Sequence, residues 1–230
     1  MTSCHEHNEE SQLKQVLAWL GQGLVLALVS DAGTPLISDP GFVLVRAARG
    51  HGYTVTTAPG PCAVTAALSV SGLPTDRFVF EGFLPSRQGQ RRLYLAQLKT
   101  EQRTLVFYES PRRAAAALRD MVSVFGAQRR GVIVRELTKA HESIHADTLV
   151  NIADQCDSGA VVAKGEFVLV VEGAPRDSGS DTACVDTQRL LARLLQSLTV
   201  SEAVRITADL TGAGRNQLYE RALALRNAQG

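Results

Sequence analysis

The chain has 230 residues, of which 45% are hydrophobic and 20% charged, and its mean hydropathy is close to zero. This composition is typical of a globular protein with one large or two smaller domains, and it excludes the fibrous and wholly disordered classes. The formal net charge of +1 would by itself argue against a nucleic-acid partner. The charge is unevenly distributed, however, because residues 86–135 carry 11 basic and 3 acidic side chains and both flanking regions are net acidic.

The four cysteines, at positions 4, 62, 156 and 184, lack the spacing of a zinc site or a disulfide framework. We therefore predict no metal site and expect reduced thiols. The polar, acidic start is unlike a signal peptide, and the apolar run Leu24–Val29 is far shorter than the roughly 18 residues of a membrane span. The sequence predicts a cytoplasmic protein with no membrane segment.

Helices and strands alternate along the first part of the chain. Apolar residues at helical spacing indicate a helix over Asn8–Leu20, and the continuous apolar run Leu24–Val29 is typical of a strand buried in a parallel sheet. Asp39 followed by Pro40 fits an N-cap and an N1 proline, which predicts a helix over Gly41–Gly50. The next expected elements are a strand at Tyr53–Thr57 and a helix at Cys62–Gly72.

The alternation continues beyond residue 76, where LPTD turns the chain and where we place a domain boundary. Strands are expected at Arg77–Glu81, Thr104–Tyr108, Gly131–Glu136, Ser143–Ala146 and Glu166–Glu172, and helices at Gln90–Leu98, Pro111–Phe125 and Asp147–Cys156. Three further helices are expected at Thr187–Leu198, Glu202–Leu210 and Gln217–Leu225. This order predicts an α/β fold, mostly parallel in its first half. Its expected parts are an N-terminal α/β domain (1–76), a second α/β domain (77–173), a linker (174–185) and a C-terminal helical region (186–230).

Two loops rich in glycine and proline, SDAGTPLISDPG and APGPC, follow the first two expected strands. Ligands of α/β proteins bind at the carboxyl ends of strands, where small residues let the backbone approach and an acidic side chain can accept hydrogen bonds. Asp31, Ala32, Gly33 and Thr34 occupy such a position. A tight turn before a capped helix would also explain the first loop, but a second loop at the same sheet edge favours a binding site. Neither a P-loop nor a dinucleotide fingerprint occurs.

Five segments carry a more specific signal: SDAGTPLISDPG, APGPCAVTAALSVSGLPTDRFVFEGFLP, RTLVFYESPRR, RELTKAHESIHADTL and KGEFVLVVEG. In this order and spacing they resemble the small-subunit (16S) rRNA cytidine 2′-O-ribose methyltransferases, a branch of the tetrapyrrole methylase-like family. GFLP, FYES and RELTK distinguish this branch from the cobalt-precorrin and sirohaem-forming enzymes. The resemblance implies two α/β domains with a cofactor cleft between them, S-adenosylmethionine as cofactor, a homodimer, and small-subunit rRNA or the 30S subunit as partner.

The resemblance also implies which residues contact the cofactor. They fall in three regions: Ser30, Asp31, Ala32, Gly33, Thr34 and Pro35; Cys62 and Ala63; and Tyr108, Glu109 and Leu137. The family's opening strand with its P-T-P-I-G-N-L loop is not found before His5. We therefore expect at least one opening βα unit, about 30 residues or more, to be missing. An unpaired sheet edge would favour self-association.

Methyl transfer to a ribose 2′-OH is an in-line displacement at a sulfonium methyl group, so the protein mainly has to hold the hydroxyl within about 3–3.5 Å of the methyl carbon. A base could accept the hydroxyl proton, and the candidates are Glu109, Glu136, Lys139 and Glu142. Lys139 would need a lowered pKa for this role. The alternative is that these residues are solvated or mutually paired charges at the end of a strand.

The basic block of residues 86–135 predicts contacts with RNA phosphates. Arg87, Arg91 and Arg92 open one expected helix, and Arg112 and Arg113 open another. Ten of the 11 basic residues are arginines, which suit bidentate phosphate contacts. The alternative is a solvated helix face.

Three hypotheses for function follow. The first is S-adenosylmethionine-dependent 2′-O-ribose methylation of a cytidine in small-subunit rRNA. The second is a small-molecule tetrapyrrole methyltransferase, which the cationic second domain disfavours. The third is an inactive, RNA-binding remnant that cannot hold the cofactor.

Overall fold

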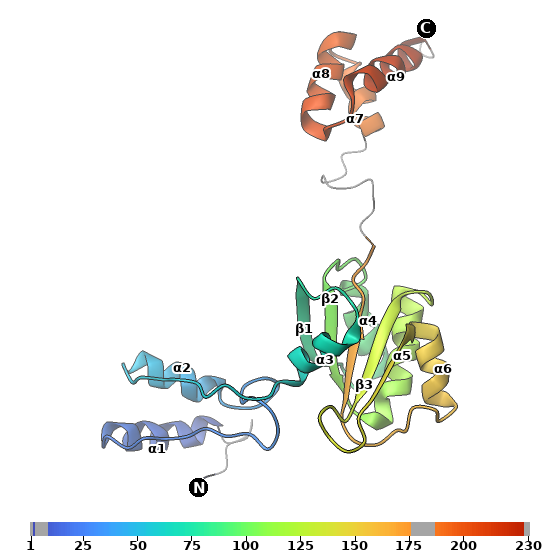
Figure 1. The fold of residues 1–230 in the computed structure, drawn as a ribbon. Coiled ribbons are helices and arrows are strands. Elements are labelled where there is room, and N and C mark those ends of the chain that lie inside the picture. Colours follow the sequence, from blue (N-terminus) through green and yellow to red (C-terminus); the bar gives the residue numbers. More distant parts are fainter. Residues whose placement is uncertain (1, 3–8, 176–186, 228–230) are drawn as a thin grey trace. The chain divides into compact units, whose positions relative to one another are not determined.

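The computed structural model describes residues 2, 9–175 and 187–227. The chain divides into two compact units, Met1–Ala174 and Pro175–Gly230. The first unit contains a sheet with helices, and residues 187–227 of the second form three helices (Figure 1). Residues 176–185 of the expected linker (174–185) and residue 186, the first of the expected C-terminal helical region, lie outside the described residues. The predicted division at residue 76 remains a proposal.

The first unit is built on one mixed five-stranded sheet. Its strands are β1 (Phe78–Phe83), β2 (Thr104–Glu109), β3 (Arg130–Arg135), β4 (Ser143–Thr148) and β5 (Phe167–Val171), in the order β1-β2-β5-β3-β4. All five coincide with predicted strands to within two residues. Only β1 and β2 pair in parallel, and the other three pairs are antiparallel. The parallel arrangement was expected for the first half of the chain, and β1 and β2, the two strands formed there among the described residues, do pair in parallel.

Helices cover both faces of the sheet. They are α3 (Ala63–Ser71), α4 (Gln88–Gln97), α5 (Pro111–Phe125) and α6 (Leu149–Asp157), each within two residues of its predicted bounds. Successive residues of a strand point to opposite faces. Leu105 and Phe107 accordingly pack in the cluster formed with α4, α5 and α6, whereas Val106 packs in the cluster formed with α3. The continuous apolar composition of β2 therefore reflects burial on both faces.

The N-terminal part of this unit contains two helices that pack against each other, α1 (Glu9–Gly21) and α2 (Phe42–Gly50). The strands predicted at Leu24–Val29 and Tyr53–Thr57 are not formed. A strand satisfies its backbone N–H and C=O groups by pairing with a neighbour, and in the described residues neither segment has one. Their apolar side chains are exposed as a result, with Val25 98% accessible.

The start of α2 also differs from the prediction. The N-cap is Gly41, with φ 130° and no side-chain cap, so neither Asp39 nor Pro40 has its predicted role. A Cβ on Gly41 would lie 2.6 Å from Leu28 Cδ2. The close packing of the preceding segment therefore requires glycine at this position, and the helix begins one residue later than predicted.

The described part of the second unit contains α7 (Thr187–Leu194), α8 (Val200–Thr211) and α9 (Arg215–Asn227), which pack on one another. Leu191, Val204 and Leu218, one from each helix, belong to their shared core. Thr199 and Glu202 form a capping box that begins α8 two residues before its predicted start.

No helix in the described ranges is both long and apolar enough to cross a membrane. The same residues contain no group of three or more His, Cys, Asp or Glu side chains that could hold a metal ion. Cys62 and Cys156 are free thiols.

Gly173, which follows β5, offers a test of the fold. A Cβ on Gly173 would lie 1.9 Å from the backbone oxygen of Gln102, so Gly173→Ala must displace the backbone that leads into β2. We expect the free energy of unfolding to fall by about 1–3 kcal/mol, measured by urea denaturation. The matched control is Gly89→Ala in α4, where a Cβ meets nothing within 4 Å; this variant should match or exceed the wild type. Equal stability of Gly173→Ala and wild type would contradict the packing described.

Candidate functional site

The two glycine-rich loops lie together. Thr34 Oγ1 donates a hydrogen bond of 2.9 Å to the backbone oxygen of Pro61. Ser30 Oγ donates one of 3.0 Å to the oxygen of Gly33, whose φ of 76° favours glycine. The loops were expected to meet because they would leave the same sheet edge. They are instead joined directly, since the strands predicted before them are not formed.

Four of the predicted cofactor contacts gather around one apolar cluster. Cys62 is the N-cap of α3, Ala63 begins that helix, Tyr108 lies in β2, and Leu137 follows β3. All four are partly buried and pack against the cluster that contains Val168. Burial, and then the neighbouring Cys62 thiol, raise the pKa of Tyr108 to about 12, so its phenol stays protonated at neutral pH. Three segments far apart in sequence therefore contribute to one surface.

The first loop also reaches the ends of β1 and β2. An ideal Cβ on Gly82, in β1, would lie 3.5 Å from Ser38 Oγ. The Asp39 carboxylate is close enough to Tyr108 to contribute to its raised pKa, after burial and Cys62. Loop residues 30–39 and the carboxyl ends of these two strands thus border the same region.

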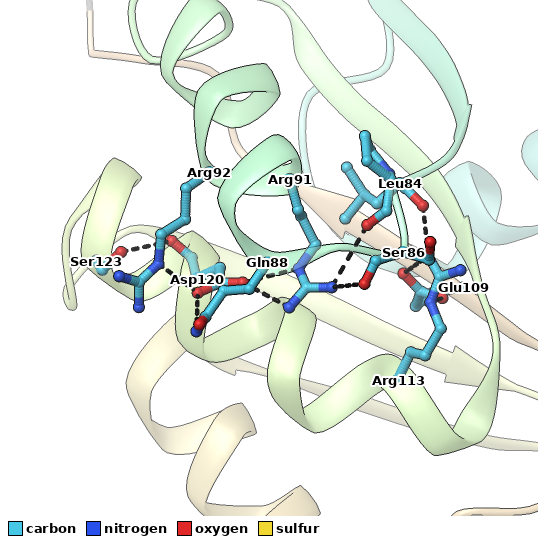
Figure 2. A network of polar contacts seen from close by, with 10 residues as sticks. Leu84, Ser86, Gln88, Arg91, Arg92, Glu109, Arg113, Asp120 and Ser123 are labelled. Carbon is cyan, nitrogen blue, oxygen red and sulfur yellow. Dashed lines mark hydrogen bonds and ion pairs between the residues drawn. The ribbon is translucent and has the colours of Figure 1, made fainter.

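Glu109 does not have the surroundings of a general base. Its side chain is fully buried and accepts a hydrogen bond of 2.7 Å from the Ser110 backbone N–H. It also forms an ion pair with Arg113, whose Nη2 lies 3.0 Å from Glu109 Oε2. Arg113 in turn donates to the backbone oxygen of Leu84 (Figure 2). Glu109 therefore anchors the start of α5 and the segment after β1.

The remaining base candidates are paired with one another. Lys139 Nζ lies 3.0 Å from Glu136 Oε1 and 2.9 Å from Glu166 Oε2. These hydrogen bonds, that of Glu166 first, raise the pKa of Lys139, the opposite of what a base requires. Glu142 Oε2 accepts a hydrogen bond of 2.6 Å from the Thr138 backbone N–H. Glu136 and Lys139 are thus arranged as the alternative of mutually paired charges describes, whereas Glu142 is bonded to the backbone.

Arg91 is buried, which contradicts its predicted role as a phosphate contact. Its side chain is 4% exposed, and its Nη2 lies 2.6 Å from Asp120 Oδ2. Its Nη1 donates to the backbone oxygens of Pro85 and Ser86, at 3.4 and 3.2 Å (Figure 2). The guanidinium group therefore holds the loop between β1 and α4 in place.

Asp120 is the centre of this network. Its carboxylate, in α5, is fully buried and also accepts hydrogen bonds from Arg92 Nε at 2.6 Å and Gln88 Nε2 at 3.3 Å. Burial alone would raise the pKa of Asp120, but the hydrogen bonds from Arg92, Arg91 and Gln88 outweigh it and lower the pKa. Sequence reasoning missed Asp120, although an acidic residue between the apolar Ala117 and Met121 of an otherwise cationic helix could have indicated it.

Arg87 and Arg112 differ from the other predicted RNA contacts. Both are exposed, and neither forms an ion pair with a carboxylate in the part of the chain that the structure describes. Arg87 is the N-cap of α4 and Arg112 lies in the first turn of α5. Of the five predicted arginines, these two have guanidinium groups that are free to bind an anion.

Comparison with known proteins identifies the family. The family described as Tetrapyrrole (Corrin/Porphyrin) Methylases matches residues 1–153, and the one described as RsmI C-terminal HTH domain matches residues 181–226. The chain therefore belongs to the tetrapyrrole methylase family, as its motifs predicted. Two solved structures share this fold, a methyltransferase CobJ (TM-score 0.54, 19% identity, 72% of each chain) and a diphthine synthase (TM-score 0.55, 13% identity, 74% of this chain and 68% of that one).

Curated relatives are much closer in sequence. A ribosomal RNA small subunit methyltransferase I from Xylella fastidiosa (strain Temecula1) is 47% identical over 95% of this chain and 80% of its own length. Proteins of the same name are 44% identical in Pseudomonas aeruginosa, over 97% of this chain and 79% of theirs, and in Mesorhizobium japonicum, over 100% and 76%.

The Asp120 network leads to a stability prediction. Asp120→Ala leaves the buried Arg91 without a counter-charge and should lower the free energy of unfolding by about 3–5 kcal/mol, measured by urea denaturation at neutral pH. Because folding lowers the pKa of Asp120, its contribution is present above the ordinary value of 3.8 and is lost as the pH falls through the folded-state pKa. The difference from wild type should therefore narrow below about pH 4.

The control for this variant is Asp154→Ala, on the exposed side of α6. It should change stability by no more than about 0.5 kcal/mol. If the two variants were equally stable, Asp120 would not be the residue that holds α4 and α5 together.

Proposed function

We propose that this protein is an S-adenosylmethionine-dependent methyltransferase that acts on small-subunit rRNA. The observation that carries the proposal is its 47% identity, over 95% of the chain, to a protein named ribosomal RNA small subunit methyltransferase I. In support, Cys62, Ala63, Tyr108 and Leu137, four of the residues that the family resemblance assigns to the cofactor, pack against one apolar cluster. The finer parts of the proposal are a cytidine 2′-OH as acceptor, the 30S subunit as partner, a homodimer and a cytoplasmic location.

The chemistry of the residues present suits the cofactor. The exposed Asp31 carboxylate and the hydroxyls of Ser30 and Thr34 can accept hydrogen bonds from ribose or ammonium groups. Ala32, Gly33 and Pro35 of the same loop have small or compact side chains, so a ligand can approach the backbone. Cys62, Ala63, Tyr108 and Leu137 offer an apolar surface for an adenine ring. S-adenosylmethionine, when bound, supplies a methyl group on a positively charged sulfur.

The protein contributes to methyl transfer chiefly by holding the acceptor hydroxyl in line with the methyl group, and not by supplying a base. Glu109 and Lys139 are engaged in ion pairs, and Glu136 and Glu142 accept hydrogen bonds from their own loop. None of the four base candidates is thus free to take the hydroxyl proton in the described arrangement. Well-oriented reacting groups can gain about 7–11 kcal/mol over a bimolecular encounter, which is enough for positioning to dominate.

The test of the function has two steps. Calorimetric titration with S-adenosylmethionine should show saturable binding, and the protein should then transfer labelled methyl groups to small ribosomal subunits from a strain that lacks this methylase. Wild-type subunits, already methylated, are the control and should accept none. Absence of cofactor binding at millimolar concentration would reject an active enzyme and leave the inactive remnant. Transfer to a tetrapyrrole but not to subunits would favour the small-molecule alternative.

Arg87 and Arg112 are the proposed contacts to the RNA backbone. Each neutralised phosphate steepens the fall of log K with log salt concentration by about 0.7–0.9. The double variant Arg87→Gln/Arg112→Gln should therefore bind small subunits with a salt slope shallower by about 1.5, measured by filter binding at several ionic strengths.

The matched control is Arg103→Gln/Arg119→Gln, because both arginines are already paired with carboxylates, of Glu101 and Asp157. This control should retain the wild-type slope. Identical slopes for the two double variants would remove Arg87 and Arg112 from the RNA contact.

A further inference from the structure

Phe83 is an exposed aromatic residue with a defined support. It ends β1 and is 57% accessible. Its ring centroid lies 5.6 Å from that of Tyr108, at an interplanar angle of 63°. Phe80 contacts the same tyrosine at 4.8 Å and 65°. Edge-to-face contacts of this kind stabilise aromatic pairs, so Tyr108 supports Phe83 while more than half of the Phe83 side chain remains open to solvent.

An irregularity in β1 places Phe83 on this side of the sheet. In a regular strand, residues 80 and 83 would point to opposite faces. The register between β1 and β2 shifts between Phe80 and Phe83, and Gly82 within this stretch has φ 64°. Bulges of this kind re-aim a side chain. As a result Phe80 and Phe83 both contact Tyr108, and the Phe83 side chain remains exposed.

Phe83 contacts the proposed cofactor residue Tyr108, and the strand that it ends leads to an unpaired arginine. Tyr108 packs with Cys62 and Ala63, and Gly82 is next to Ser38 of the first loop. Arg87, four residues after Phe83, is the N-cap of α4, and Arg112 lies in the first turn of α5, which follows β2. The strands β1 and β2 are neighbours, and each leads to a helix that begins near an unpaired arginine. An open aromatic face at the end of β1 therefore suits an unpaired nucleotide, whose base stacks on the ring and whose phosphates meet the cations.

We propose that Phe83 is the platform on which the base of the methylated nucleotide stacks. This inference rests on the proposed function and specifies its substrate as an unpaired nucleotide. Stacking holds the nucleotide so that its ribose, not its base, faces the cofactor residues around Tyr108. Recognition through a ring face is tolerant of base identity, so Phe83 positions the nucleotide and does not select it.

The experiment compares substitutions at the two ends of β1. Phe83→Ala should raise the KM for unmethylated small subunits by about 5- to 100-fold, with kcat and the Kd for S-adenosylmethionine near the wild-type values. Phe83→Leu, which keeps apolar bulk but lacks a ring, should resemble Phe83→Ala, and Phe83→Tyr should resemble the wild type. The control is Phe78→Ala at the other end of the strand, 41% exposed, which should leave KM unchanged.

A second readout does not depend on activity. A short single-stranded oligouridine that carries one central 2-aminopurine should lose fluorescence on binding to the wild type and to Phe78→Ala, but not to Phe83→Ala, because stacking on a ring face tolerates any base. The inference is overturned if Phe83→Ala quenches 2-aminopurine like the wild type, if Phe83→Leu keeps the wild-type KM, or if the loss is in S-adenosylmethionine affinity, which would place Phe83 in the cofactor site. Quenching that depends on Phe83, with no methyl transfer by the wild type, would retain the platform and reject the proposed function.

Discussion

The buried ion pair between Asp120 and Arg91 is the interaction on which the proposed site depends. Asp120 lies in α5 and Arg91 in α4, and Arg91 also binds the backbone oxygens of Pro85 and Ser86. One carboxylate therefore fixes two helices and the loop between β1 and α4. On the other side of this loop, Arg113 links Glu109 to the backbone oxygen of Leu84 (Figure 2). Phe83 and Arg87 border the loop that these two contacts hold.

The same network explains how the basic block should be interpreted. A net charge of +8 over residues 86–135 indicates a phosphate-binding surface, but many of these arginines face carboxylates in the fold. Two arginines share Asp120, and others pair with Glu101, Glu109 and Asp157. A buried charge is costly unless it is paired, so part of the cationic excess maintains the fold. The free cations that we propose as RNA contacts, Arg87 and Arg112, lie at the start of the helices that this pairing orients.

Features that depend on local interactions could be predicted from the sequence, whereas features that depend on residues far apart in the chain could not. The bounds of the helices and strands from β1 to β5 were predicted to within two residues. Their apolar residues recur at the spacing of the face that is buried in the fold, and turn residues mark their ends. Leu24–Val29 has equally strong strand character, but a strand also needs a neighbour, and composition does not show whether one is present. Burial of Arg91 could not be seen from its residue type, since it depends on Asp120 29 positions away. The position of Phe83 likewise depends on a bulge that alternation alone does not reveal.

The central claim is that loop residues 30–35, the start of α3, the end of β2 and the segment after β3 form one cofactor site. Hydrogen–deuterium exchange of the full chain, with and without saturating S-adenosylmethionine, tests it most directly. We expect slower exchange of backbone amides in residues 30–35, 61–64, 108–110 and 136–138 on addition of the cofactor, and no change in α7–α9. Protection confined to other segments, or no protection at a cofactor concentration that saturates binding, would contradict the account.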